Sequence, residues 1–202
     1  MASKNYTVSK MNIVVAISLG GCLLLLNIFL FVQNRNLKVN SDGRNREIVL
    51  KEGKALLPLV GIDADEIKQT LDWGKDGRKT VVMIFSPQCG YCRENMPIWN
   101  EIISKADKSL FRIVAASSIA EGAKEFVEAY EFKGIPILIE PEPRSKVEYV
   151  MYLTPQTILV DQTGKIERVW IGPVQNEKKS EIETSLNIKL LNDLTSNPTY
   201  KF

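Results

Sequence analysis

Two cysteines separated by two residues, Cys89 and Cys92, are the side chains of this sequence best suited to chemistry. The apolar run before them, residues 80–85, predicts a buried strand, and the pattern after Cys89 predicts a helix. The first turn of a helix offers unpaired N–H groups and the positive end of the helix dipole, which stabilise a thiolate at Cys89. Cys92, one turn further and facing inward, is expected to resolve a bond formed by Cys89. The pair is therefore predicted to be a redox dithiol.

A Cys-x-x-Cys pair also occurs in zinc sites and as a purely structural disulfide or pair of packed thiols. Structural zinc takes four ligands, whereas this chain has no histidine and one further cysteine, Cys22, inside an apolar run. We therefore expect no metal. Structural cysteines are uncommon at a helix start after a buried strand, which favours redox chemistry. Without histidine, Cys–His and Ser–His nucleophiles are excluded as well, and we expect no cofactor.

The composition describes one globular domain of ordinary size with an appendage. The chain has 202 residues, of which 45% are hydrophobic, with 26 basic and 24 acidic side chains. Because the charges balance and no basic block is interleaved with aromatic residues, we expect no nucleic-acid partner.

The N-terminal part predicts a tail, residues 1–11, followed by a transmembrane anchor, residues 12–33. The anchor is uncharged, and about 20 helical residues at roughly 1.5 Å each span a bilayer core. A cleaved signal peptide and a lipoprotein signal are the alternatives, the latter because residues 19–22, Leu-Gly-Gly-Cys, resemble a lipobox. The apolar run continues ten residues past Cys22, which is too long for the apolar region of a signal peptide and unlike the polar start of a mature lipoprotein. Cys22 is then an inert apolar residue of the anchor.

The orientation of this anchor is ambiguous from charge. Two lysines and the α-amino group precede it, whereas five basic residues follow it, Arg35, Lys38, Arg44, Arg46 and Lys51. By the positive-inside rule alone, the domain would be cytoplasmic. An exchange-active dithiol argues for an extracytoplasmic domain instead.

After the anchor we predict a polar tether, residues 34–54, then a domain, residues 55–194, and a short tail, residues 195–202. The predicted strands cover residues 55–60, 80–85, 111–116, 133–139, 157–160 and 165–171. The predicted helices cover residues 63–73, the segment after Cys89 with Pro97 inside it, and residues 121–132, 147–153 and 176–194. A strand over residues 67–71 is the alternative to the first helix. This order predicts an α/β fold with a mixed central sheet and helices on both faces.

Three separated features together resemble the thioredoxin fold: Cys89-Gly-Tyr-Cys92 after a strand, Pro97 five residues beyond, and Thr154-Pro155 directly before a strand and hairpin. With the anchor and the run Tyr149 to Lys165, the chain is similar to membrane-tethered thiol-disulfide oxidoreductases of the TlpA and ResA type. The resemblance covers residues 55–194.

The resemblance implies that Pro155 is cis and lies against the dithiol, where the backbone of Thr154 pairs with a bound substrate chain. An ordinary trans turn is the alternative. Tyr91, between the cysteines, is the third residue expected to contact substrate. The chain departs from the family pattern at Gln88, where many relatives have tryptophan, and at Met83, where thioredoxins bury an acid. The group that relays protons to Cys92 and the direction of electron flow are left open by these departures.

The resemblance also implies a function and a location. The chain is expected to exchange disulfides with protein substrates on the outer, periplasmic side of a bacterial cytoplasmic membrane, together with an upstream redox partner. Reduction, as in cytochrome c maturation, is the direction most often implied. An oxidase or isomerase is the enzymatic alternative, and a non-catalytic binding or Cu(I)-chaperone module is the other, although only Met96 accompanies the two thiols as a soft ligand.

Overall fold

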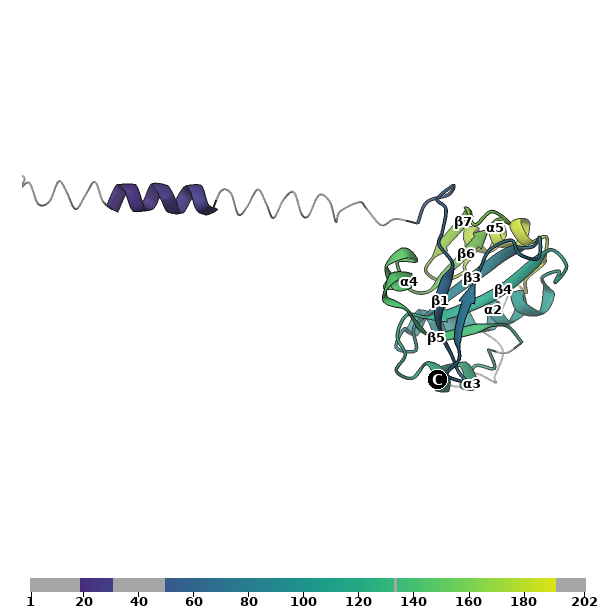
Figure 1. The fold of residues 1–202 in the computed structure, drawn as a ribbon. Coiled ribbons are helices and arrows are strands. Elements are labelled where there is room, and N and C mark those ends of the chain that lie inside the picture. Colours follow the sequence, from purple (N-terminus) through teal and green to yellow (C-terminus); the bar gives the residue numbers. More distant parts are fainter. Residues whose placement is uncertain (1–18, 31–49, 133, 192–202) are drawn as a thin grey trace, which may run out of the picture. The chain divides into compact units, whose positions relative to one another are not determined.

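The computed structural model describes residues 19–30, 50–132 and 134–191 (Figure 1). The chain divides into two units, Met1–Glu47 and Ile48–Phe202. In the first unit, residues 19–30 are helical, and both ends of the predicted anchor lie outside the described residues. No helix among the described residues combines the length and the apolar character needed to cross a membrane.

The second unit is built on one seven-stranded mixed sheet. Its strands run in the order β2-β1-β5-β4-β3-β6-β7, with β3–β4 and β4–β5 parallel and the other neighbours antiparallel. The strands are β1 (Leu59–Asp63), β2 (Lys68–Leu71), β3 (Lys79–Phe85), β4 (Phe111–Ser117), β5 (Ile137–Pro141), β6 (Gln156–Val160) and β7 (Ile166–Ile171). β3 therefore lies inside the sheet, where both of its faces are covered.

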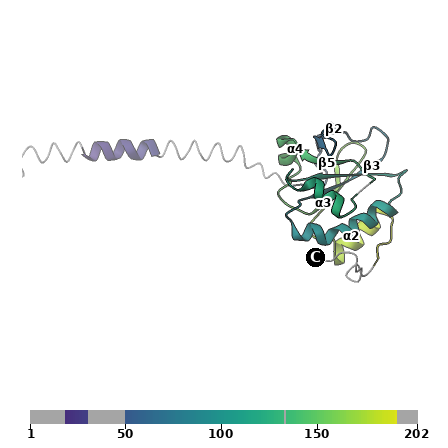
Figure 2. The same cartoon turned by 90° about the horizontal axis from the view of Figure 1, so that it is seen from below.

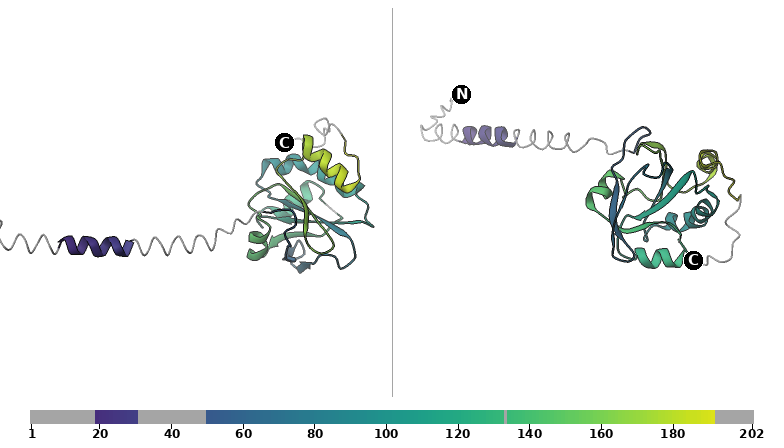
Figure 3. Two further views of the ribbon diagram at one scale, coloured as in Figure 1. Left: turned by 90° about the horizontal axis from the view of Figure 1, so that it is seen from above. Right: turned by 45° about the vertical axis from the view of Figure 1, so that its right-hand side comes forward.

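Helices cover both faces of this sheet. They are α2 (Gly90–Lys105), α3 (Ala123–Ala129), α4 (Pro143–Glu148) and α5 (Asn176–Leu186). Side chains of α2, α3 and α5 pack in one hydrophobic cluster on one face, and Figures 2 and 3 show α5 next to α2. The segment after α4 packs on the opposite face. The predicted mixed sheet with helices on both faces is confirmed.

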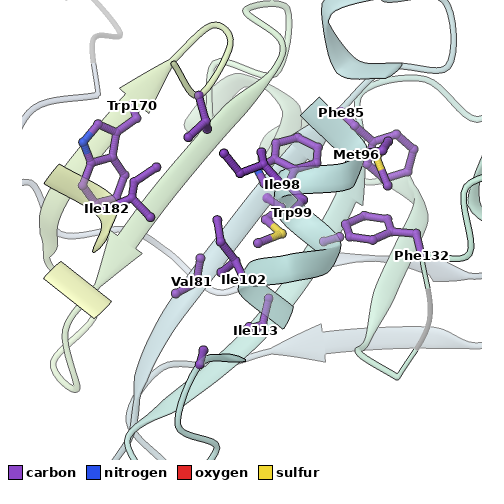
Figure 4. Packing of buried hydrophobic residues seen from close by; sticks show 14 of the residues in the cluster. Val81, Phe85, Met96, Ile98, Trp99, Ile102, Ile113, Phe132, Trp170 and Ile182 are labelled. Carbon is purple, nitrogen blue, oxygen red and sulfur yellow. The ribbon is translucent and has the colours of Figure 1, made fainter. Parts of the chain in front are cut away.

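The core explains why the dithiol helix is held firmly against the sheet. Alternate residues of β3 enter the two clusters: Val81, Met83 and Phe85 face α2, whereas Val82 and Ile84 face the other layer. All five are fully buried, as expected for an apolar central strand. Figure 4 shows Met96, Trp99 and Ile102 of α2 among the residues of the first cluster.

The helix predicted over residues 63–73 is wrong, and the alternative strand is the one that forms. The Asp63 carboxylate accepts hydrogen bonds from the N–H groups of Asp65 and Ile67, both at 3.0 Å, and Glu66 has a positive φ of 63°. Asp63 therefore closes a turn between β1 and β2 instead of capping a helix. These hydrogen bonds also lower the pKa of Asp63, the Ile67 N–H most strongly.

Other boundaries move as well: the strand predicted over residues 133–139 forms as β5, residues 137–141, and the helix predicted over residues 121–132 is shorter, as α3. The predicted helix over residues 147–153 forms earlier, as α4, and the predicted C-terminal helix ends at Leu186, because Asn187 adopts a left-handed conformation there. The first strand begins at Leu59 rather than at residue 55. At the N-terminal side, Leu50 is buried and the Gly53 N–H donates to the Ile166 carbonyl at 2.7 Å. Part of the predicted tether thus packs on the domain.

Candidate active site

The dithiol sits where β3 turns into α2. β3 ends at Phe85, the Cys89 N–H donates to the Ser86 carbonyl at 3.1 Å, and α2 begins at Gly90. Cys89 is the N-cap residue, and its Sγ accepts the Cys92 N–H at 3.3 Å. A backbone donor aimed at this sulfur stabilises negative charge on it. The sequence-based placement of Cys89 at the start of the helix is the one observed.

Cys92 lies beneath Cys89 and is inaccessible to solvent. Its exposed fraction is 0%, whereas Cys89 is half-buried, and both are free thiols. Burial raises the pKa of the Cys92 thiol well above its ordinary value, and the neighbouring Cys89 adds to this increase. The Ser86 N–H donates to the Cys92 Sγ at 3.4 Å, which acts in the opposite direction. Cys92 is thus held as a neutral thiol under the first sulfur.

A second segment, 65 residues along the chain, completes the site. The Thr154–Pro155 peptide bond is cis, as the resemblance implies, and the Cys89 thiol donates to the Thr154 carbonyl at 3.6 Å. The Gly172 N–H donates to the Pro155 carbonyl at 2.7 Å, so the end of β7 holds this loop from the other side. The structure therefore brings together Cys89, Cys92, Thr154 and Pro155.

Tyr91 also lies at the site, but unlike Cys92 its side chain is exposed to solvent. It occupies the first turn of α2 and is 60% exposed, so its ring is available to an incoming molecule. Gln88, where many relatives have tryptophan, is exposed as well. Met83 is fully buried in the same cluster as Cys92. Among the described residues, none of the buried polar side chains is acidic, so no buried carboxylate underlies the dithiol there.

The two segments that form the site, helix α2 with the cysteines and strand β6 with the preceding Thr154–Pro155 loop, are joined through the core. Trp99, on the buried face of α2, donates its Nε1–H to the Thr157 hydroxyl at 2.9 Å, and both side chains are buried. Thr157 lies two residues after Pro155 in β6. The indole ring also stacks on Phe132, with ring centroids 6.0 Å apart. This contact fixes the helix that carries the sulfurs to the strand that follows the cis peptide bond.

Sequence reasoning missed two contributors to this arrangement. The Ser86 N–H is a backbone group, so its side chain gives no signal of the bond to Cys92. The Trp99–Thr157 pair has a partial signal, because a tryptophan on the apolar stripe of a helix needs an acceptor when buried. Its partner, however, is 58 residues away along the chain, and only the sheet order reveals it.

This geometry suits two-step thiol-disulfide exchange. An accessible sulfur with a backbone donor can attack, and a second thiol one helical turn away can displace whatever the first one binds. Only Cys89 can react with a protein partner, because Cys92 is buried.

Comparison with known families agrees with this geometry. The family model described as Redoxin matches residues 51–186, which is most of the chain. The chain belongs to the Redoxin family. The matched region of this Redoxin chain contains both cysteines and the Thr154–Pro155 loop. The resemblance to thioredoxin-like thiol-disulfide oxidoreductases of the TlpA and ResA type is confirmed at this level.

Individual relatives of this Redoxin chain are distant. It is 21% identical over 110 residues to sporulation thiol-disulfide oxidoreductase A from Bacillus subtilis, a match that covers 52% of this chain and 66% of that protein. A thiol-disulfide isomerase from Corynebacterium glutamicum superposes with a TM-score of 0.52 at 22% identity, covering 66% of this chain and 96% of that one. The thioredoxin domain of a thiol-disulfide oxidoreductase from Bacteroides vulgatus gives 0.51 at 21% identity, covering 69% and 100%. These structures share its fold.

Proposed function

We propose that this protein is a membrane-anchored thiol-disulfide oxidoreductase that exchanges disulfides with protein substrates through Cys89 and Cys92. One observation carries the proposal: a half-buried Cys89 sulfur accepts a backbone N–H and lies beside both the buried Cys92 thiol and the Thr154 carbonyl. Such an arrangement of one accessible and one buried thiol supports exchange more directly than storage of a ligand.

The reaction proceeds in two displacements. The Cys89 thiolate attacks one sulfur of a substrate disulfide; the substrate S–S bond breaks, and the second substrate sulfur leaves as a thiolate and takes up a proton. Cys92 then loses its proton and attacks the Cys89 sulfur, which releases the first substrate sulfur as a thiol. Two electrons pass to the substrate, and the domain retains a Cys89–Cys92 disulfide. A partner dithiol must reduce this disulfide before the next cycle.

Turnover distinguishes this proposal from a binding or metal-chaperone module. We expect the full chain, in detergent, to accelerate the reduction of insulin by dithiothreitol over many cycles. Cys89→Ser should return the rate to the uncatalysed background, because a hydroxyl does not replace the thiolate as a nucleophile. Insulin turbidity and free-thiol release measure the reaction.

Cys22→Ser is the matched control, since it removes the third thiol and leaves the dithiol intact. If the wild-type chain consumes no more than one equivalent of disulfide above the uncatalysed background, the proposal fails in favour of the binding-module alternative.

We propose reduction as the direction, as in the maturation of cytochromes c, where substrate cysteines must be kept reduced. The resemblance to the TlpA and ResA type supports this choice. The structural neighbour from Corynebacterium glutamicum is named an isomerase, and isomerisation is the second candidate. An isomerase would release its substrate from Cys89 without oxidation of Cys92, so the redox state of the domain after one turnover separates the two.

The proposed location is the periplasmic side of the cytoplasmic membrane. It rests on the uncharged segment, residues 12–33, which includes the helical residues 19–30, and on the need of a stable disulfide for an oxidising compartment. The excess of basic residues after this segment argues for the opposite orientation.

Accessibility of a C-terminal tag tests the orientation. We expect protease to remove a tag fused after Phe202 from intact spheroplasts, because the domain is proposed to lie outside. A cytoplasmic protein should stay intact in the same sample as the control. A tag that is cleaved only after the membrane is lysed would place the domain in the cytoplasm.

A further inference from the structure

The loop that leads into Thr154 starts from an unusual backbone conformation. Val150 follows the end of α4 with a φ of 49°, and this β-branched residue is buried. The Val150 N–H donates to the Val147 carbonyl at 3.2 Å, and the Met151 N–H donates to the Lys146 carbonyl at 3.0 Å. These paired bonds form a Schellman ending, whose left-handed position normally holds glycine or asparagine. Valine in this conformation is strained, so neighbouring contacts must hold it.

One of those contacts comes from Gln156, the first residue of β6. Its side chain is fully buried, and its Nε2 donates to the Val150 carbonyl at 2.8 Å. The same carbonyl accepts the Leu153 N–H at 3.0 Å. Gln156 therefore joins the two ends of a short loop, residues 150–155, which contains both Thr154 and the cis bond.

Stability alone does not account for this glutamine. Its Oε1 is buried and accepts no hydrogen bond from the described residues. A buried amide that is only half satisfied is unfavourable compared with an apolar side chain of similar size. The contact that the amide does make is to Val150, the first residue of the loop whose Thr154 carbonyl accepts the Cys89 thiol.

We propose that Gln156 is a positioning residue for thiol-disulfide exchange: its amide holds the loop of residues 150–155 and so sets Thr154 at the distance from Cys89 that a peptide substrate needs. The tip of the loop presents Tyr152, 77% exposed, and Leu153, 40% exposed. A peptide disulfide bound at Cys89 lies next to this loop, because the Thr154 carbonyl is in contact with the Cys89 sulfur. A small disulfide without a peptide backbone need not contact it. This inference rests on the proposed oxidoreductase activity.

The test compares two disulfide substrates in the full chain, a peptide disulfide and bis(2-hydroxyethyl) disulfide. Gln156→Met keeps the length of the side chain and removes the donor. We expect kcat/KM for the peptide to fall roughly tenfold, by the loss of one buried hydrogen bond, chiefly through a higher KM. The rate with the small disulfide should stay within about twofold of wild type, since its reaction needs only the two sulfurs.

Val160→Ala is the matched control. Val160 lies on the same strand and the same face as Gln156, is also fully buried, and is far along the strand from the loop. Both variants are assayed at a temperature at which circular dichroism shows them folded. We expect Val160→Ala to lower stability and to leave both rates unchanged. Equal rates with the peptide for wild type and Gln156→Met would overturn the proposal, as would an equal loss with both disulfides.

Gln156→Glu gives an independent test if the methionine variant does not fold. A neutral carboxylic acid can donate to the Val150 carbonyl, whereas a carboxylate cannot. The peptide rate of this variant, divided by that of wild type, should therefore fall as pH rises. A ratio that does not change with pH would contradict the inference. If wild type itself reduces neither disulfide, the proposed function fails. This outcome differs from the results above, which would overturn only the role of Gln156.

Discussion

Mixed disulfides with partner proteins should accumulate when the Cys92→Ser variant is expressed in the cells that normally make this protein. The change removes the buried thiol that releases the substrate and leaves the attacking Cys89 with its backbone donor. Release must then come from an external thiol. Because an intramolecular thiol acts at a far higher effective concentration than millimolar external thiols, the lifetime of the complex should increase on the order of a thousandfold. Non-reducing electrophoresis and mass spectrometry measure the trapped complexes.

Two strains serve as controls for this experiment. One carries Cys89→Ser alone, and the other carries Cys89→Ser together with Cys92→Ser. No complexes should form in either, and those in the single Cys92→Ser strain should disappear on reduction. The trapped partners would show whether the substrates are apocytochromes or other secreted proteins. Trapping at the level of the Cys89→Ser control would contradict the assignment of Cys89 as the attacking thiol.

Trp99→Ala should destabilise the domain more than Val160→Ala does, because it removes a larger buried side chain. The indole is fully buried, stacks on Phe132 and donates to Thr157. Its removal leaves a cavity and an unpaired hydroxyl, and we expect a loss of about 3–5 kcal/mol in the free energy of unfolding. Urea denaturation followed by circular dichroism measures this loss.

Trp99→Phe separates the loss of packing from the loss of the hydrogen bond, since it keeps most of the ring packing and removes only the N–H donor. It should lose less than the alanine variant. An exposed site on the same helix, Ser104→Ala, should change stability by no more than about 0.5 kcal/mol. If Trp99→Ala were as stable as wild type, this contact would not be what joins α2 to β6 at the site.

The position of the dithiol could be predicted from the sequence because the signals for it are local. The apolar run of β3 and the cysteine spacing lie within about a dozen residues and place Cys89 at a helix start. Thr154-Pro155 is also local, but its place beside Cys89 came from the family resemblance. No periodicity links two segments that meet only through the order of strands in the sheet.

The predictions that were wrong have a common physical cause. Asp63 resembles a helix cap, yet its carboxylate closes a turn between two strands, and the side chain is the same in both uses. Valine at position 150 gives no sign of a helix end, because the residue type contradicts the left-handed conformation that the tertiary contacts impose. In both places, contacts of the folded domain override the local preference: β1 pairs with β5 at Asp63, and the Gln156 amide holds the Val150 carbonyl.

The burial of Cys92 restricts the order in which partners can meet this protein. Cys89 is the only sulfur of the pair that reaches solvent, so in the proposed cycle the molecule that supplies electrons and the molecule that receives them must approach the same few atoms. They cannot be bound at the same time. The cycle is therefore of the ping-pong type, and each partner is a competitive inhibitor of the other. At the proposed membrane location, the ratio of the two partners near the domain would then govern the rate as much as the affinity for either partner.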